Sequence, residues 1–96
     1  PDPMGGTAVE RRVRIKNAAG LHARPCHAFV TIAQAHKSTL RVASGGNEVD
    51  GKSILSLMTL GAPVEAELHL RAEGEDAQHL VDALVALVES GFGELD

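Results

Sequence analysis

Ninety-six residues are enough for one small domain and too few for a second hydrophobic core. The chain is 44% hydrophobic and 23% charged, which is ordinary for a globular protein, and 13 acidic against 9 basic residues give a formal charge of −4. That negative charge, with only two Phe and no Trp or Tyr, argues against a nucleic-acid-binding protein, which needs basic patches and aromatic stacking platforms.

The single cysteine cannot form an internal disulfide, which favours a reducing, cytoplasmic location. No apolar run approaches the roughly 18 residues of a membrane span, so we expect no membrane insertion, and the N-terminus lacks the core of a signal peptide. The three residues before Met4 resemble an expression remnant. We therefore expect residues 1–6 to form a remnant and disordered N-terminus, and residues 7–94 to form one domain.

Apolar and charged residues alternate from Ala8 to Lys16, which predicts a half-buried strand with one polar side chain, Arg11, on its buried side. Residues 17–20 (Asn-Ala-Ala-Gly) end this strand. Pro25 suits the first position of a helix, because its fixed φ and missing N–H are tolerated there. A helix from about Pro25 to His36 follows from apolar residues at spacings of three and four, namely Cys26, Phe29, Val30 and Ala33.

The next segment has the pattern of a β-hairpin. Residues 39–43 predict a short strand with Leu40 and Val42 facing inward. The sequence Ser-Gly-Gly-Asn at residues 44–47 is typical of a tight turn, and residues 48–50 form the start of a returning strand.

Two helices and one strand are expected in the remainder. Ser53 can cap a short helix from Ile54 to Leu60, which Gly61 would end. Residues 65–72 alternate and predict a strand. An acidic turn at residues 74–76 then leads into a helix with an apolar stripe, formed by Leu80, Val81, Leu84, Val85 and Val88.

The predicted order is strand, helix, strand, strand, short helix, strand, helix. Antiparallel strands with their helices on one face make an α+β open-faced two-layer sandwich, here a four-stranded sheet covered by three helices. The other face of the sheet would be exposed to solvent, which explains the alternation in the first and last strands.

The loop Gly20–Pro25 places an imidazole, His22, and a guanidinium, Arg24, two residues apart at the start of a helix. The N–H groups there have no partner inside the helix, and with the helix dipole they favour an anion such as phosphate. A neutral imidazole is a competent nucleophile, and an arginine can bind two oxygens of a phosphoryl group. The pattern therefore suits a covalent phosphohistidine, and the alternative is a histidine that only caps a helix beside a solvated arginine.

Three segments in register make this pattern specific. Residues 20–25 (Gly-Leu-His-Ala-Arg-Pro) resemble the active-site signature of HPr, the histidine-containing phosphocarrier family of the bacterial phosphoenolpyruvate:sugar phosphotransferase system. Residues 51–61 and 72–77 resemble two further segments of that family, and the resemblance runs from about Thr7 to Glu94. The fold of the family agrees with the predicted elements.

The resemblance implies roles for individual residues. His22 matches the histidine that carries phosphate on Nδ1, Arg24 matches the arginine that contacts the phosphoryl group, and Pro25 matches the proline at the helix start. Ser53 matches the serine that HPr kinase/phosphorylase modifies. The exposed apolar patch that docks partner proteins would consist of Ile54, Leu55 and Met58.

The implied function is phosphoryl relay by a carrier protein, not an enzyme. His22 would accept a phosphoryl group from phosphorylated enzyme I and pass it to a histidine of an EIIA-type acceptor in sugar uptake. The chain would need no cofactor and would act as a cytoplasmic monomer. A regulatory paralogue in a nitrogen-type phosphorelay is the alternative. One departure is Ala19, because the family often has Asn just before the loop glycine, so one polar contact to the site is lost.

His22, Cys26 and His27 also allow a hypothesis of another class, a metal- or redox-responsive binding module. Cys26 belongs to the apolar stripe of the predicted helix, so its sulfur should face the core, and no fourth ligand is evident. We therefore predict no metal site. His27 should face outward, with a partner-contact or plain surface role. The remaining histidines are expected to be solvated surface residues: His36, His69 and His79.

Overall fold

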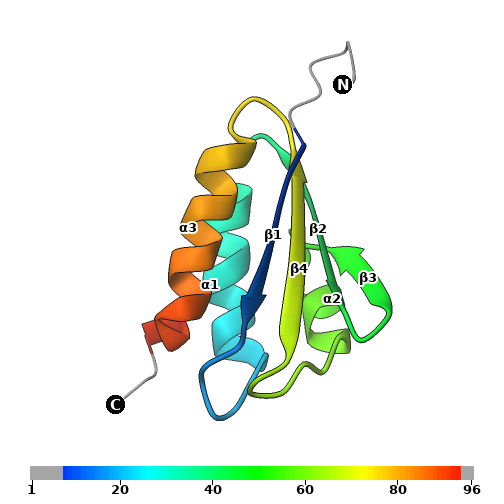
Figure 1. The fold of residues 1–96 in the computed structure, drawn as a ribbon, viewed down its shortest axis with the longest axis vertical. Coiled ribbons are helices and arrows are strands. Elements are labelled where there is room, and N and C mark those ends of the chain that lie inside the picture. Colours follow the sequence, from blue (N-terminus) through cyan, green and yellow to red (C-terminus); the bar gives the residue numbers. More distant parts are fainter. Residues whose placement is uncertain (1–7, 94–96) are drawn as a thin grey trace.

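The structure is a computed structural model that describes residues 8–93, so the expectations for residues 1–6 lie outside the described part. The elements follow the predicted order: β1 (Ala8–Arg14), α1 (Ala23–Gln34), β2 (Thr39–Ser44), β3 (Asn47–Asp50), α2 (Ile54–Thr59), β4 (Glu67–Glu73), α3 (Ala77–Glu89) and a single 3-10 turn (Gly91–Gly93). The strands form one antiparallel sheet in the order β1-β4-β2-β3, and the helices lie against one side of it (Figure 1). The α+β open-faced sandwich is confirmed.

The core lies between the sheet and the helices. Val13 of β1 is opposite Leu68 of β4, and Leu70 of β4 is opposite Val42 of β2, so the apolar positions align across the strands. These side chains are buried together with the apolar stripes of α1 and α3, whose members include Phe29 and Leu84. The apolar residues that recur every three or four positions in the helices and every second position in the strands therefore pack together in a single core.

Four predicted boundaries were wrong by two residues. β1 ends at Arg14 and not at Lys16. α1 begins at Ala23, so Pro25 occupies the third helical position, where the N–H would have no acceptor inside the helix either. The same helix ends at Gln34 and not at His36. β4 begins at Glu67, because Glu65 has a φ of 72° and lies in a turn, with its N–H donating to the carbonyl of Ile15 at 2.8 Å.

Arg11 is not a buried polar residue, as the alternation predicted. It is exposed, and its guanidinium lies 3.7 Å from the carboxylate of Asp82 on α3. β1 is an edge strand of the sheet, so a long side chain on its helix-facing side can extend past the layer of helices into solvent.

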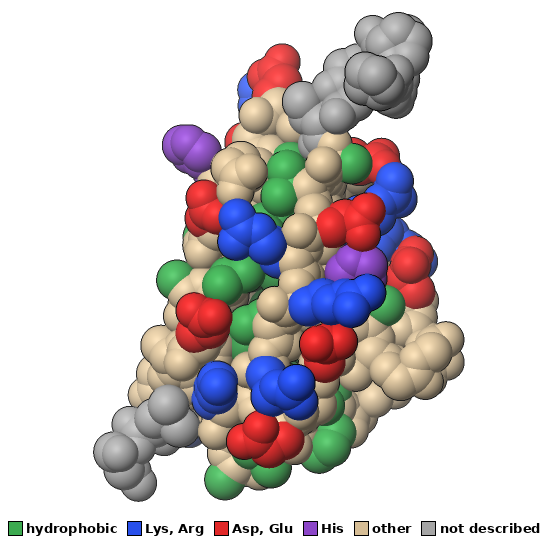
Figure 2. Space-filling model, in the orientation of Figure 1, with side chains coloured by type: hydrophobic (Ala, Val, Ile, Leu, Met, Phe, Trp, Pro, Cys, Tyr) green, Lys and Arg blue, Asp and Glu red, His purple; other side chains and the backbone are tan. Residues whose placement is uncertain are grey.

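The open face of the sheet carries interleaved charges (Figure 2). His69 is partly buried there, with its Nε2 2.7 Å from the carboxylate of Glu10, and Arg71 pairs with Glu73 at 2.6 Å. His69 is thus a surface residue as expected, with the addition that its ring contacts a carboxylate. His36 is also partly buried, with its Nδ1 2.8 Å from the carbonyl of Ile32, whereas His79 is exposed as expected.

The acidic turn before α3 acts across the fold. Asp76 is the N-cap residue of α3, but its side chain makes no cap hydrogen bond to that helix. The carboxylate of Asp76 accepts hydrogen bonds from the N–H groups of Lys37 and Ser38 at 2.8 and 2.9 Å, and a further one from the Ser38 hydroxyl. The Ser38 hydroxyl and the Lys37 N–H hold the pKa of Asp76 well below its usual range. Asp76 thus fastens the end of the α1–β2 connection to the start of α3.

Candidate functional site

His22 is the N-cap residue of α1. Its backbone is extended, with φ −111° and ψ −169°, its N–H donates to the carbonyl of Gly20 at 3.1 Å, and its own carbonyl accepts from the N–H of Cys26 at 3.0 Å. The residue is partly exposed, and Arg24 in the first turn is exposed. The structure therefore places an imidazole and a guanidinium together at the solvent-accessible start of a helix, as the sequence predicted.

Gly20 lets this loop pack closely against the connection between α2 and β4. Its φ is +70°, and a Cβ atom there would lie 2.4 Å from the carbonyl oxygen of Ala62 and 2.9 Å from the Cα of Pro63. The next N–H, that of Leu21, donates to the carbonyl of Ala62 at 2.9 Å. Only a residue without a side chain fits this close approach of two backbones.

Asn17 is a site residue that the sequence analysis missed. It was assigned only to the break after the first strand, yet its side chain is 1% exposed and its Nδ2 donates to the carbonyl of Gly20 at 2.9 Å. The family pattern directed attention to position 19 and thus to Ala19, whereas the buried amide enters the loop from two residues earlier. The signal available in the sequence was a single amide side chain, Asn17, between the alternating strand and the turn, where it could bond to the loop backbone.

Cys26 and His27 are neighbours in sequence but not in environment. Cys26 is fully buried, as expected, and burial raises the pKa of its thiol to about 11, which disfavours the thiolate that a metal requires. His27 is exposed. Within residues 8–93, no group of three or more His, Cys, Asp or Glu side chains is placed to hold a metal ion. The structure does not bring His22, Cys26 and His27 together as a ligand set.

Ser53 is the N-cap of α2, and its hydroxyl oxygen accepts a hydrogen bond from the N–H of Ser56 at 3.2 Å. In the helix that follows, Leu55 is 77% exposed and Met58 is 39% exposed. Ile54, in contrast, is only partly exposed and packs against the core, so it is less accessible than the sequence predicted, and its role in docking stays a prediction.

Further apolar surface lies beyond α2. Val64, 38% exposed, is a large hydrophobic residue in the connection to β4 that the sequence analysis did not select. We call Leu55, Met58 and Val64 the apolar patch. No feature of the sequence around Val64 distinguished it from a core residue.

α1 and α2 are joined by polar contacts as well as by packing. The ammonium of Lys52 donates to the carbonyl of His36 just after the end of α1 at 2.8 Å, and the amide of Gln34 donates to the carbonyl of Lys52 at 3.3 Å. Lys52, the residue before the N-cap Ser53, is therefore hydrogen-bonded to the end of α1.

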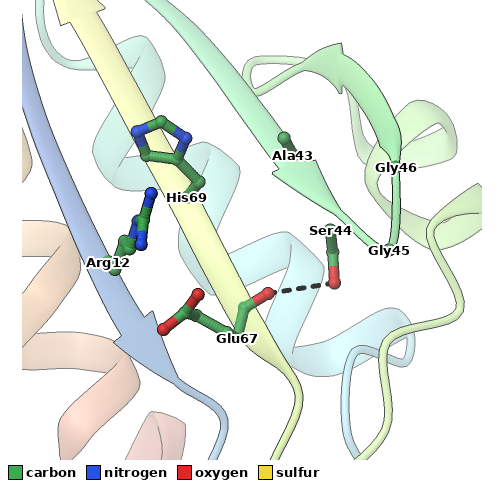
Figure 3. A pocket seen from close by; sticks show the side chains of 7 residues that line it. All are labelled: Arg12, Ala43, Ser44, Gly45, Gly46, Glu67 and His69. Atoms are coloured by element: carbon green, nitrogen blue, oxygen red, sulfur yellow. Dashed lines mark hydrogen bonds between the residues drawn. The ribbon is translucent and has the colours of Figure 1, made fainter.

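A shallow hollow lies on the open face of the sheet (Figure 3). Arg12, Glu67 and His69 border it, and Ala43 with the Gly45-Gly46 turn leaves it open because these residues have small side chains or none. The Ser44 hydroxyl donates to the carbonyl of Glu67 at 3.0 Å. This hollow lies on the sheet face away from the helices, so it is separate from the start of α1.

Over the described residues, no helix is long and apolar enough to cross a membrane.

Comparison with known proteins is consistent with this arrangement. A family model described as "PTS HPr component phosphorylation site" matches residues 9–90. The phosphocarrier protein HPr of Cupriavidus necator is 36% identical over 86 residues, which cover 90% of this chain and 97% of that protein. The phosphocarrier protein NPr of Proteus mirabilis is 34% identical over 85 residues, covering 88% and 94%. The crystal structure of HPr-C-His from Thermoanaerobacter tengcongensis superimposes with a TM-score of 0.87 at 41% identity, covering 92% of this chain and 99% of that one.

Proposed function

This chain belongs to the HPr family of the phosphotransferase system, and from that premise we propose that His22 is its phosphoryl acceptor. In this proposal the protein takes a phosphoryl group from phosphorylated enzyme I and passes it to a histidine of an EIIA-type acceptor in sugar uptake. The observation that carries the proposal is the position of His22 as a partly exposed N-cap with Arg24 in the first turn of the same helix.

The transfer conserves atoms and charge. The lone pair of Nδ1 on a neutral His22 ring attacks the phosphorus, and the bond from phosphorus to the donor imidazole breaks with its electron pair going to the donor nitrogen. A donor ring that carries a proton on its other nitrogen leaves as neutral imidazole, while the His22 ring keeps its own N–H and becomes a phosphoimidazolium. The second transfer, to the acceptor, repeats the same exchange.

The protein supplies position and charge to this exchange. Phosphoryl transfer passes through a loose, in-line transition state in which negative charge is spread over three oxygens. Arg24 can bind two of those oxygens with its fork, and the N–H groups at the start of α1 point toward the same region. Since the chemistry needs no other group, the carrier works without a cofactor.

The docking surface in this proposal is the apolar patch together with the exposed His27 of α1. Leu55 and Met58 are exposed, and an adaptable methionine suits a surface that must bind a donor and an acceptor in turn. Phosphorylation of Ser53 by an HPr kinase/phosphorylase would place two negative charges beside Leu55 and weaken docking. The carrier would act in this cycle as a cytoplasmic monomer.

A nitrogen-type relay is the second candidate. Its support is the similarity to the NPr of Proteus mirabilis, whose 34% identity is close to the 36% found for the HPr of Cupriavidus necator. The two candidates share the His22 chemistry and differ in the partners that bind the docking surface.

The test is incubation with phosphoenolpyruvate and enzyme I, followed by intact mass measurement. We expect one added phosphate, which mild acid removes and base does not. Transfer from the phosphorylated chain to a carbohydrate-type EIIA or to its nitrogen-type counterpart then separates the two candidates. An unmodified mass after incubation with both kinds of enzyme I contradicts the proposal.

A further inference from the structure

Asn17 holds the backbone that leads into His22 by two hydrogen bonds to one residue. Its main-chain carbonyl accepts from the N–H of Gly20 at 3.1 Å, and its side-chain Nδ2 donates to the carbonyl of Gly20 at 2.9 Å. Both polar groups of Gly20 are therefore bound by Asn17. The amide is buried, so its hydrogen bond is shielded from competition with water.

The same Gly20 carbonyl is also the acceptor for His22. The N–H of His22 donates to it at 3.1 Å, so one oxygen connects the Asn17 amide to the backbone of His22. On its other side Gly20 touches Ala62 and Pro63, which prevents the peptide from turning away. The orientation of this peptide thus determines where the N-cap residue of α1 starts.

From these contacts we infer that Asn17 is a positioning residue for phosphoryl transfer, which acts by fixing the Gly20 carbonyl and through it the direction of His22. This inference rests on the proposed function of His22. Asn17 does not touch the phosphoryl group in this role; it restricts the arrangements of the acceptor ring. Displacing a reacting group by about 1 Å can cost on the order of a hundredfold in rate.

The test compares variants that separate the hydrogen bond from the volume of the side chain. Asn17→Asp keeps the shape but replaces the donor by an oxygen that faces the Gly20 carbonyl, and Asn17→Ala removes the side chain. Val81→Ala, in the buried stripe of α3, serves as a control for general loss of stability, and Asn47→Ala changes an exposed asparagine. Urea denaturation identifies conditions in which every variant is folded.

We expect both Asn17 variants to lower the maximal rate of transfer from phosphorylated enzyme I by about tenfold or more, with a KM within about twofold of the unchanged protein. The KM should hold because the apolar patch is untouched. Val81→Ala and Asn47→Ala should keep the maximal rate. Equal rates for Asn17→Asp and the unchanged protein overturn the inference, as does an equal loss in Val81→Ala.

A second measurement does not depend on phosphorylation. Hydrogen exchange of the His22 amide should accelerate by about tenfold in Asn17→Asp relative to amides of the core, because its acceptor peptide is no longer held. A uniform change over the whole chain, or none, contradicts the positioning role. If the unchanged protein accepts no phosphate from enzyme I, the proposed function fails, and the exchange of the His22 amide still decides whether Asn17 holds the peptide before His22.

Discussion

The loop before α1 and the short helix α2 both bear residues that we propose for phosphoryl relay, but they are built in different ways. In the loop, residues 17–22 are held by a buried amide, by a glycine with φ +70° and by a hydrogen bond to Ala62. In α2, only Leu57 is fully buried, and Leu55 is 77% exposed. The chemistry of transfer depends on the direction of one ring, whereas docking depends on accessible apolar area. The loop should therefore tolerate change poorly and the helix surface well.

The largest expected effect is that of His22→Ala, which should abolish acid-labile phosphorylation because the nucleophile is gone. His27→Ala is the matched control: it removes an exposed imidazole that the proposal assigns to docking and not to transfer, so the variant should still reach full phosphorylation at the end of the incubation. Intact mass after incubation with enzyme I and phosphoenolpyruvate measures both. Persistent labelling of His22→Ala would place the acceptor elsewhere.

Substitution of two glycines tests the difference between the two regions: Gly20 lies in the loop before α1, and Gly61 lies just after α2. Gly20→Ala combines a φ of +70° with a Cβ only 2.4 Å from the Ala62 carbonyl oxygen, whereas Gly61→Ala has a φ of +57° and nothing within 4 Å. We expect the first to cost about 3 kcal/mol in the free energy of unfolding and to slow transfer, and the second to cost about 1 kcal/mol. Circular dichroism in urea measures this difference, since the chain has no Trp or Tyr. Similar losses in both variants would mean that the close contact at Gly20 is unimportant.

Charge at the start of α2 should weaken docking without unfolding the helix. Ser53→Asp adds a negative charge beside Leu55, and we expect transfer from enzyme I to fall about tenfold, because that surface must be desolvated on binding. Ser53→Ala removes the hydrogen bond from the Ser56 N–H and should cost about 1 kcal/mol in stability with little change in transfer. Transfer by Ser53→Asp at the unchanged rate would contradict the proposal that phosphorylation of Ser53 weakens docking.

Within α2 itself, Leu55 and Leu57 should separate binding from stability. Leu55→Ala is expected to raise the KM for enzyme I about fivefold through the loss of apolar contact area, with stability changed by less than about 0.5 kcal/mol. Leu57→Ala, at a fully buried position, should instead cost about 3 kcal/mol in stability. A KM unaffected by Leu55→Ala would remove α2 from the docking surface.

The smallest effect concerns Cys26, on the buried side of the first turn of α1. Because burial raises the pKa of its thiol from 9.0 to about 11, the folded state holds the proton more tightly than the unfolded chain does. This contribution to stability is complete below about pH 9 and is lost as the pH rises through about 11. Thiol reagents should label Cys26 slowly in the folded protein and rapidly in denaturant.

Cys26→Ala checks the same point by thermodynamics. It should cost about 1 kcal/mol, remove the loss of stability between pH 9 and 11, and leave His22 phosphorylation intact. Rapid labelling of the native thiol, or tight zinc binding that this variant loses, would favour the metal or redox hypothesis instead.

The sequence alone determined the order of the elements and the fold class. Apolar spacings of three and four placed Cys26, Phe29 and Val30 in the core side of one helix, and the Gly45-Gly46 pair, with φ of +58° and +86°, formed the expected hairpin turn. The cap at Ser53 was also correct. These features depend on neighbours in the chain, whose chemistry is visible in a short window of residues.

The tertiary structure decided what depends on residues far apart in the chain. The N–H of Leu21 donates to the carbonyl of Ala62, and the N–H of Glu65 donates to the carbonyl of Ile15. The ring of His69 on β4 contacts the carboxylate of Glu10 on the neighbouring strand β1. The burial of Asn17 has the same origin, since a sequence window shows a polar side chain but not what covers it. Local periodicity records which face of an element is apolar, while the contacts that fix a loop arise only when the chain closes on itself.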